Sequence, residues 1–229
     1  MKYDIIIFDA DETLFDFKKS EKDAFKNTML EFDIEYDENH HLKIYKEINT
    51  AIWKELEDGL ITQKKLKIER FKRLSDRLEA RFDEGEFAKS YMNHLSQASF
   101  LYDDSIELVE SLHKNYRLTI ITNGLKIVQD NRIRKSTIAK YFEDIVVSEE
   151  VQVSKPDPKI FEIALDNIKH ADRSKVLIVG DSLTSDIQGG INFGIDTCWF
   201  NPNKLENRTG IKPTYEISNL MELKGILEK

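Results

Sequence analysis

The chain has 229 residues, which is enough for one large domain or for a domain with a sizeable insertion. Hydrophobic residues make up 40% and can supply a core, while 33% charged residues can supply a solvated surface. The formal net charge of -8 argues against a nucleic-acid polymer as partner, because binding a phosphate backbone requires a basic face. A small phosphorylated substrate is compatible with this charge, since one metal ion and one lysine can neutralise it.

The single cysteine, Cys198, cannot form an internal disulfide, which suits a reducing cytosol. It lies in the apolar run 197–200, so we expect a buried core thiol rather than a nucleophile. The N-terminus leads straight into an apolar strand with no room for a signal peptide, and no apolar stretch approaches the ~20 residues that cross a bilayer. We therefore expect a cytoplasmic protein without a membrane partner, either a monomer or a homodimer.

The first predicted element is the apolar run 5–8, which ends at two acids, Asp9 and Asp11. A short β-branched run without polar alternation predicts a strand that is buried on both faces, as in a parallel sheet. Such sheets bind ligands beyond the carboxyl ends of their strands. Two acids at that place need a cation between them, and Mg²⁺ with a phosphate is the obvious candidate. Alternatively, the two acids only begin a turn and cap the next segment of the chain.

Residues 16–99 show helical periodicity and no convincing strand. Helices are predicted at 18–32, 41–56, 62–78 and 84–98. Thr62 is the expected cap of the third helix, and Asp58-Gly59 is the expected end of the second. Helices without a sheet to cover must pack on each other as a bundle. The alternative, ordinary layer helices of the sheet, is disfavoured because a single crossover needs far fewer residues.

From Tyr102 onward helices and strands alternate, which is typical of α/β folds. Strands are predicted at 118–121, 144–147, 175–179, 197–200 and 215–217. Helices are predicted at 104–115, 125–141, 159–168, 184–193 and 220–227. The predicted fold is therefore α/β, with a Rossmann-like, mostly parallel sheet sandwiched by helices. Residues 1–15 and 100–229 would form this core domain, and residues 16–99 an inserted α-helical bundle cap.

Polar residues come after the carboxyl ends of four predicted strands: Asp9 with Asp11, Thr122-Asn123-Gly124, Lys155, and Asp181 with Asp186 shortly after it. Because parallel strands share that end, these side chains can converge on one site. Each also has a plain alternative, namely turn chemistry, a solvated surface lysine, a helix cap and a surface acid. The Thr122 hydroxyl, together with N–H groups at the start of the next helix, would suit an anion.

Together these segments resemble the four motifs of the haloacid dehalogenase-like (HAD) hydrolase superfamily. The matching residues are Asp9-Ala10-Asp11-Glu12-Thr13, Thr122, Lys155 and the run Gly180-Asp181-Ser182-Leu183-Thr184-Ser185-Asp186. They occur in the family's order, and the resemblance spans the whole chain, cap included. It implies a HAD-like fold. Phosphatases of this superfamily carry an aspartate at the position of Asp11 and dehalogenases do not, which favours phosphoester hydrolysis over carbon–halogen cleavage.

The predicted chemistry assigns a role to each acid. Asp9 ends its strand and is expected to attack phosphorus, giving an aspartyl-phosphate intermediate. Asp11 is expected to protonate the leaving alkoxide and then to act as base on the hydrolytic water. The resemblance implies that Mg²⁺ is held by the Asp9 side chain, the Asp11 backbone carbonyl and the Asp181 side chain. Asp186 would lie behind these ligands and orient a metal-bound water or Lys155.

Thr122, Asn123 and Lys155 are the predicted substrate-binding residues, with the lysine neutralising developing charge. The four carboxylates carry a formal charge of about -4, which Mg²⁺ and Lys155 offset by about +3.

The resemblance is greatest to the bacterial pyrimidine 5′-nucleotidase branch, through the Thr-Asn-Gly second motif and the helical cap. It implies a nucleoside 5′-monophosphate as substrate, with selectivity supplied by the cap. Four cap aromatics could stack on a base, although aromatics at helical spacing are more often core: Trp53, Phe71, Phe87 and Tyr91. The alternatives are a sugar-phosphate phosphatase, a β-phosphoglucomutase-like phosphotransferase, and a non-catalytic regulatory module that binds Mg²⁺ and phosphate.

Overall fold

The structure is a computed structural model that describes residues 2–228, and the chain divides into two compact units. Unit 1 comprises Met1–Phe17 and Ser99–Lys229. Unit 2, Lys18–Ala98, is inserted between these two segments.

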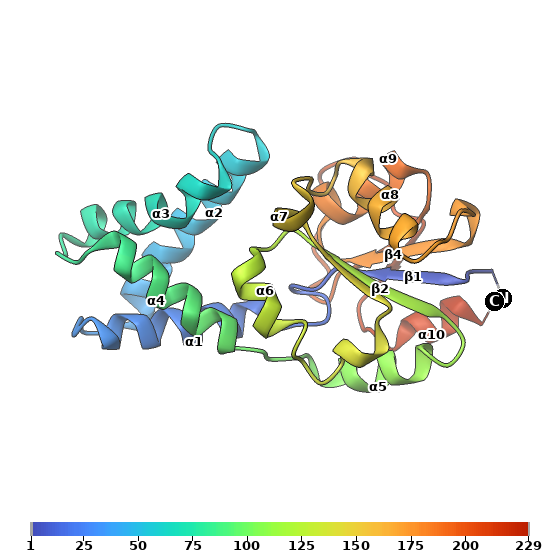
Figure 1. The fold of residues 1–229 in the computed structure, drawn as a ribbon, viewed down its shortest axis with the longest axis horizontal. Coiled ribbons are helices and arrows are strands. Elements are labelled where there is room, and N and C mark those ends of the chain that lie inside the picture. Colours follow the sequence, from blue (N-terminus) through green and yellow to red (C-terminus); the bar gives the residue numbers. More distant parts are fainter. Residues whose placement is uncertain (1, 229) are drawn as a thin grey trace. The chain divides into compact units, whose positions relative to one another are not determined.

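Unit 1 is built on a six-stranded sheet whose paired strands are all parallel (Figure 1). The strands are β1 (Ile5–Phe8), β2 (Arg117–Thr122), β3 (Asp144–Val147), β4 (Val176–Gly180), β5 (Asp196–Phe200) and β6 (Tyr215–Ile217). Their order in the sheet is β3-β2-β1-β4-β5-β6, so β1 lies in the middle. The predicted α/β fold with a parallel sheet is confirmed.

Helices and turns connect the strands of unit 1. The α-helices are α5 (Asp103–Leu112), α6 (Lys126–Arg132), α7 (Ser148–Val151), α8 (Pro158–Asn167), α9 (Gln188–Phe193) and α10 (Glu222–Leu227). Shorter turns are η2 (Ala139–Tyr141), η3 (Arg173–Lys175) and the π-helical turn η4 (Leu183–Ile187). The sequence predicted these helices to within a few residues, except that it missed α7 and extended α6 too far. No helix within residues 2–228 has the length and apolar character needed to cross a bilayer.

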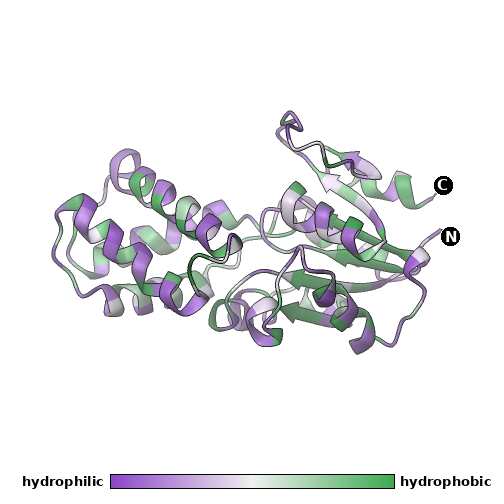
Figure 2. Ribbon diagram, turned by 90° about the horizontal axis from the view of Figure 1, so that it is seen from above, coloured by the Kyte–Doolittle hydropathy of each residue, from purple (hydrophilic) through white to green (hydrophobic). Residues whose placement is uncertain are grey.

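Strand β1 is buried on both faces. Successive side chains of a strand point to opposite sides, and those of β1 enter two different core clusters. Ile6 and Phe8 belong to the cluster that includes residues of α5 and α10. Ile5 and Ile7 belong to the cluster on the other face, with residues of α8 and α9. Figure 2 shows the resulting hydrophobic strands between helices that are hydrophobic on one side only. Double burial explains why no polar residue interrupts this run.

Helix α6 is much shorter than the helix predicted at 125–141, which was wrong in extent. It ends at Arg132, and Ile133 is its C-terminal cap. Ile133 and Ile138 are both fully buried in the same core cluster. On a continuous helix, residues five apart lie about 140° apart and cannot share a face. The break in the helix allows both isoleucines to reach the core.

Unit 2 is an all-helical bundle. Its elements are α1 (Phe17–Glu31), η1 (Glu38–Leu42), α2 (Lys43–Glu57), α3 (Gln63–Leu78) and α4 (Glu84–Gln97). The side chain of Thr62 accepts a hydrogen bond from the Lys65 N–H, as expected of the predicted cap. The predicted end of α2 is also confirmed, since Gly59 has a φ of 71°, a value that favours glycine after a helix.

The core of unit 2 is aromatic. Phe71, Phe87 and Tyr91 are fully buried, and the Phe71 ring centroid lies 5.1 Å from both other rings. These three residues therefore stabilise the bundle and have no surface with which to stack on a base in this structure. Trp53, the fourth candidate for base stacking, is partly exposed.

Candidate active site

The carboxyl edge of the sheet brings together residues that are far apart in sequence. Asp9 directly follows β1, Thr122 ends β2, and Asp181 directly follows β4. Strand β1 pairs with both β2 and β4, and Phe8 is in register with Ile120 and Val179. The strand order reverses between β1 and β4, which is the switch point where open α/β sheets bind ligands.

Lys155 lies inside this edge of the sheet. Its Nζ atom is 2.5 Å from Asp9 Oδ1 and 2.7 Å from Asp186 Oδ1. The same ammonium group donates a hydrogen bond to the carbonyl oxygen of Ile121, over 2.7 Å. The residue is only 2% exposed, so the solvated surface lysine of the plain alternative is wrong. A buried lysine between two acids serves as the local countercharge.

Burial perturbs the charges of this cluster. Burial raises the pKa of Asp9 to about 6, although the nearby Lys155 ammonium has the opposite effect and lowers this pKa. Burial, followed by repulsion from Asp186 and Asp9, raises the pKa of Asp181 well above its usual range. For Lys155, burial alone would lower the pKa, but the carboxylates of Asp186 and Asp9 together raise it above the usual value. The site therefore has more buried negative charge than its lysine can balance.

The acid cluster can hold a hard divalent cation. Asp9, Asp181 and Asp186 each offer a carboxylate oxygen, and these oxygens lie within 4.8 Å of one another. An all-oxygen, carboxylate-rich ligand set fits Mg²⁺. The Asp11 side chain is not a member of this cluster. Asp186 is also engaged elsewhere, since its Oδ2 accepts a hydrogen bond from the Ser182 N–H at 3.0 Å.

Asp11 points to a partner that the sequence did not reveal. Both terminal nitrogens of Arg132 donate to Asp11 Oδ1, and Gln129 Nε2 lies 3.1 Å from Asp11 Oδ2. Arg132 is completely buried. The predicted charge balance counted Lys155 as the only side-chain cation and therefore omitted Arg132. A basic residue in the predicted helix after Thr-Asn-Gly could have indicated the partner of Asp11. Arg134 and Lys135 have the same property, so the sequence does not single out Arg132.

The two other predicted substrate-binding residues differ in their contacts. Thr122 is 2% exposed, and its Oγ1 lies 3.3 Å from Gln129 Nε2. The side-chain amide of Asn123 donates to the Lys155 carbonyl and accepts from the Lys155 N–H, both over 2.9 Å. This reciprocal pair fixes the Lys155 backbone. The Asn123 side chain is therefore a support for the lysine loop in this structure.

One N–H group at the N-terminus of α6 is already engaged in this structure. The Lys126 N–H donates to Glu149 Oε2 over 2.8 Å. The helix also starts four residues after Thr122 and is only seven residues long. The Lys126 N–H is therefore not available to a phosphate in this structure.

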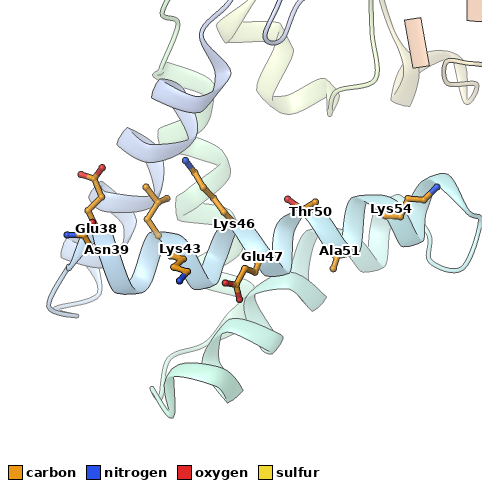
Figure 3. Close-up of a pocket in the computed structure, with 9 residues that line it drawn as sticks. Glu38, Asn39, Lys43, Lys46, Glu47, Thr50, Ala51 and Lys54 are labelled. Carbon is orange, nitrogen blue, oxygen red and sulfur yellow. The ribbon is translucent and has the colours of Figure 1, made fainter. Parts of the chain in front are cut away.

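A surface hollow in unit 2 is separate from the acid cluster. It is lined by side chains of η1 and α2, including Lys43, Lys46 and Lys54 (Figure 3). Figure 3 shows these lysines pointing in different directions, and Lys54 is paired with Asp58 at 2.8 Å. The hollow therefore lacks the converging charges of a phosphate site.

Most of the sequence matches a known family. The family described as haloacid dehalogenase-like hydrolase matches residues 6–200. The chain belongs to this family. This result confirms the resemblance drawn from the four motifs, and it identifies the protein as an enzyme of the hydrolase class.

Bacterial relatives of this HAD-like hydrolase match it along its whole length. It is 36% identical to the pyrimidine 5′-nucleotidase YjjG of Escherichia coli, covering 100% of both chains. It is also 36% identical to the pyrimidine 5′-nucleotidase PynA of Streptococcus pneumoniae, covering 100% of this chain and 97% of the relative. The magnesium-bound crystal structure of the HAD-hydrolase YfnB of Bacillus subtilis is similar over 100% of both chains, with 34% identity and a TM-score of 0.93.

Proposed function

We propose that the protein is a Mg²⁺-dependent phosphomonoesterase that acts as a 5′-nucleotidase on nucleoside 5′-monophosphates, pyrimidine nucleotides first among them. The observation that carries this proposal is Lys155, buried between Asp9 and Asp186 beside a third acid, Asp181. A nucleophile, a countercharge and a cation site thus share the carboxyl edge of one sheet. The names of YjjG and PynA support the choice of substrate.

In the proposed mechanism, Asp9 attacks the phosphorus atom, and the bond from phosphorus to the sugar oxygen breaks. Asp11 gives a proton to the departing alkoxide. Asp11 then takes a proton from water, and the resulting hydroxide cleaves the aspartyl phosphate and frees inorganic phosphate. Lys155 and Thr122 bind the phosphate oxygens, Lys155 neutralises their developing charge, and the Asn123 side chain holds the Lys155 backbone in place. When bound, Mg²⁺ would shield the charge of the phosphate.

Four further assignments belong to the same proposal. The Asp9 and Asp181 side chains, with the Asp11 backbone carbonyl, would hold the cation, and Asp186 would orient Lys155. Unit 2 would be the helical cap domain and would supply substrate selectivity. The enzyme would act in the cytoplasm on a free small phosphate ester, without a nucleic-acid polymer or a membrane as partner.

Phosphate release from a panel of phosphomonoesters tests the substrate class. We expect the highest kcat/KM with pyrimidine nucleoside 5′-monophosphates, lower values with purine nucleotides and the lowest with sugar phosphates. A maximum on a sugar phosphate would instead identify a sugar-phosphate phosphatase. Isomerisation of a sugar phosphate without phosphate release would indicate a mutase. No turnover on any ester would favour the non-catalytic module that binds Mg²⁺ and phosphate.

Removal of divalent cations is expected to lower kcat/KM by at least about 100-fold, because shielding of the phosphate charge is worth several kcal/mol. The measurement is nucleotidase activity after exhaustive chelation and then on titration with Mg²⁺, which should restore it. A parallel titration with K⁺ at matched ionic strength controls for salt. Full activity in the chelated enzyme would eliminate the metal from the mechanism.

Gly180→Ala is expected to disturb the site from within β4. A Cβ atom at Gly180 would lie 2.3 Å from Asp186 Oδ2 and 2.4 Å from its Cγ, so the carboxylate must move away. Because misplacement by about 1 Å can cost about 100-fold, we expect kcat to fall about 10- to 100-fold. Gly225→Ala is the matched control, since its Cβ meets nothing within 4 Å. Equal kcat values for both variants would contradict this role of Asp186.

A further inference from the structure

We propose that Arg132 and Gln129 are positioning residues that hold the Asp11 side chain for proton transfer. This inference rests on the proposed phosphatase function, in which Asp11 is the acid and base. Neither residue is part of the four motifs, and neither belongs to the acid cluster that fits the cation.

The Asp11 carboxylate is held at both of its oxygens. Arg132 donates through both terminal nitrogens to Oδ1, and Gln129 Nε2 reaches Oδ2 at 3.1 Å. The two donors are three residues apart on α6 and therefore share one helix face. Because each carboxylate oxygen has its own donor, the plane of the carboxylate is fixed. Proton transfer requires that kind of fixed orientation.

Arg132 is itself immobilised. Its guanidinium carbon lies 5.3 Å from the ring centroids of both Phe15 and Phe17. Its backbone carbonyl accepts a hydrogen bond from Ser99 Oγ over 2.6 Å. A cation held between two aromatic rings has few alternative rotamers. The buried guanidinium also needs Asp11, because an unpaired buried charge is costly.

Gln129 connects Asp11 to the residue expected to bind phosphate. Its Nε2 atom lies between Asp11 Oδ2, at 3.1 Å, and Thr122 Oγ1, at 3.3 Å. Gln129 is only 2% exposed, so its contacts with Asp11 and Thr122 are shielded from solvent. One amide group thereby sets the position of the acid relative to a predicted phosphate ligand.

A purely structural role for Arg132 makes a different prediction. Loss of a structural residue would slow turnover of every substrate alike. Loss of a correctly placed proton donor should slow a substrate with an alkoxide leaving group, which needs the proton. It should spare p-nitrophenyl phosphate, whose phenolate leaves without one. The ratio of the two kcat/KM values therefore separates the two roles.

The experiment compares Arg132→Met with the wild type on a pyrimidine nucleoside 5′-monophosphate and on p-nitrophenyl phosphate. We expect kcat/KM to fall about 100-fold for the nucleotide and less than about 5-fold for the aryl ester. Arg132→Lys keeps the charge but loses the paired donors, so its kcat/KM for the nucleotide should lie between those of the wild type and Arg132→Met. The matched control is Arg134→Met, two residues further along the chain, where the guanidinium pairs with Glu150. Its kcat/KM values for the nucleotide and for the aryl ester should both equal those of the wild type.

A double-mutant cycle tests whether Arg132 acts through Asp11. In an Asp11→Asn background, Arg132→Met should cost less than about 3-fold further on the nucleotide, since the group it positions is already lost. If Arg132→Met fails to fold, Gln129→Met tests the same proposal, with an expected loss of about 10-fold confined to the nucleotide.

Equal losses on both substrates, or additive losses in the cycle, would overturn the positioning role and leave the proposed function standing. A wild-type enzyme that hydrolyses neither substrate would overturn the proposed function, and the inference would fall with it.

Discussion

Asp9→Asn is expected to lower phosphomonoester turnover by about four orders of magnitude or more, because it removes the proposed covalent nucleophile. The amide keeps the size of the side chain, and the residue sits directly after a fully buried strand. The fold should therefore be intact. The measurement is phosphate release from the preferred nucleotide, with circular dichroism as the check on folding.

The stability of Asp9→Asn separates loss of the nucleophile from simple unfolding. Burial raises the pKa of Asp9 from 3.8 to about 6, so the folded protein binds this proton more tightly than the unfolded chain. Ionised Asp9 consequently costs stability, and this cost is absent below pH 3.8 and complete above about pH 6. In metal-free buffer at neutral pH the variant should melt no lower than the wild type.

Asp4→Asn is the matched control, because Asp4 is exposed just before the opposite end of β1. It should keep turnover within about twofold. Near-normal activity of Asp9→Asn would refute the nucleophile assignment.

Lys155→Met is expected to damage both activity and stability. It leaves Asp9 and Asp186 buried without the ammonium that lies within 2.7 Å of each. Breaking a buried ion pair from one side costs about 3–5 kcal/mol of unfolding free energy. Loss of the charge proposed to stabilise the transferring phosphoryl group should lower kcat about 1,000-fold. Urea unfolding in metal-free buffer and steady-state kinetics give the two values.

The stability loss in Lys155→Met should shrink as the pH falls. The wild-type lysine has a raised pKa, so its contribution is complete below its unfolded pKa of 10.5 and constant across the acidic range. In the variant, protonation of Asp9 relieves its unpaired buried charge, and burial raises the pKa of Asp9 to about 6 even in the wild type.

We therefore expect a smaller deficit at pH 5 than at pH 7.5. Adding Asp186→Asn should recover stability but not turnover. Lys159→Met, at an exposed lysine paired with Glu162, controls for the loss of a charge. A deficit that is the same at both pH values would contradict this electrostatic account.

Much of the acid cluster could be predicted because the pattern of apolar runs alone indicates where each parallel strand ends. An apolar run buried on both faces implies parallel neighbours, and parallel neighbours place their carboxyl ends at one edge. The positions of Asp9 and Asp181 are a direct result of that rule. Lys155 needed the family's order of motifs as well, since its loop lies away from any strand end in sequence.

Arg132 could not be predicted because its position depends on where α6 ends. No Gly or Pro between Arg132 and Ile138 marks the end of the helix, and nothing in the residues themselves tells which arginine turns inward. The break is decided by core packing of the two isoleucines. The support that Asn123 gives to Lys155 could not be predicted for a related reason. The Asn123 amide pairs with the backbone of Lys155, 32 residues away, and local turn chemistry carries no trace of that contact.

The lysine shared by two carboxylates has a consequence for the order in which the site fills. Its ammonium is already paired with Asp9 and Asp186, and the guanidinium of Arg132 with Asp11. Under the proposed function, an arriving phosphate dianion therefore meets no spare positive charge from these side chains. Nucleotide and product alike should associate weakly until a dication is in place, so free magnesium would set the fraction of enzyme that is competent to bind.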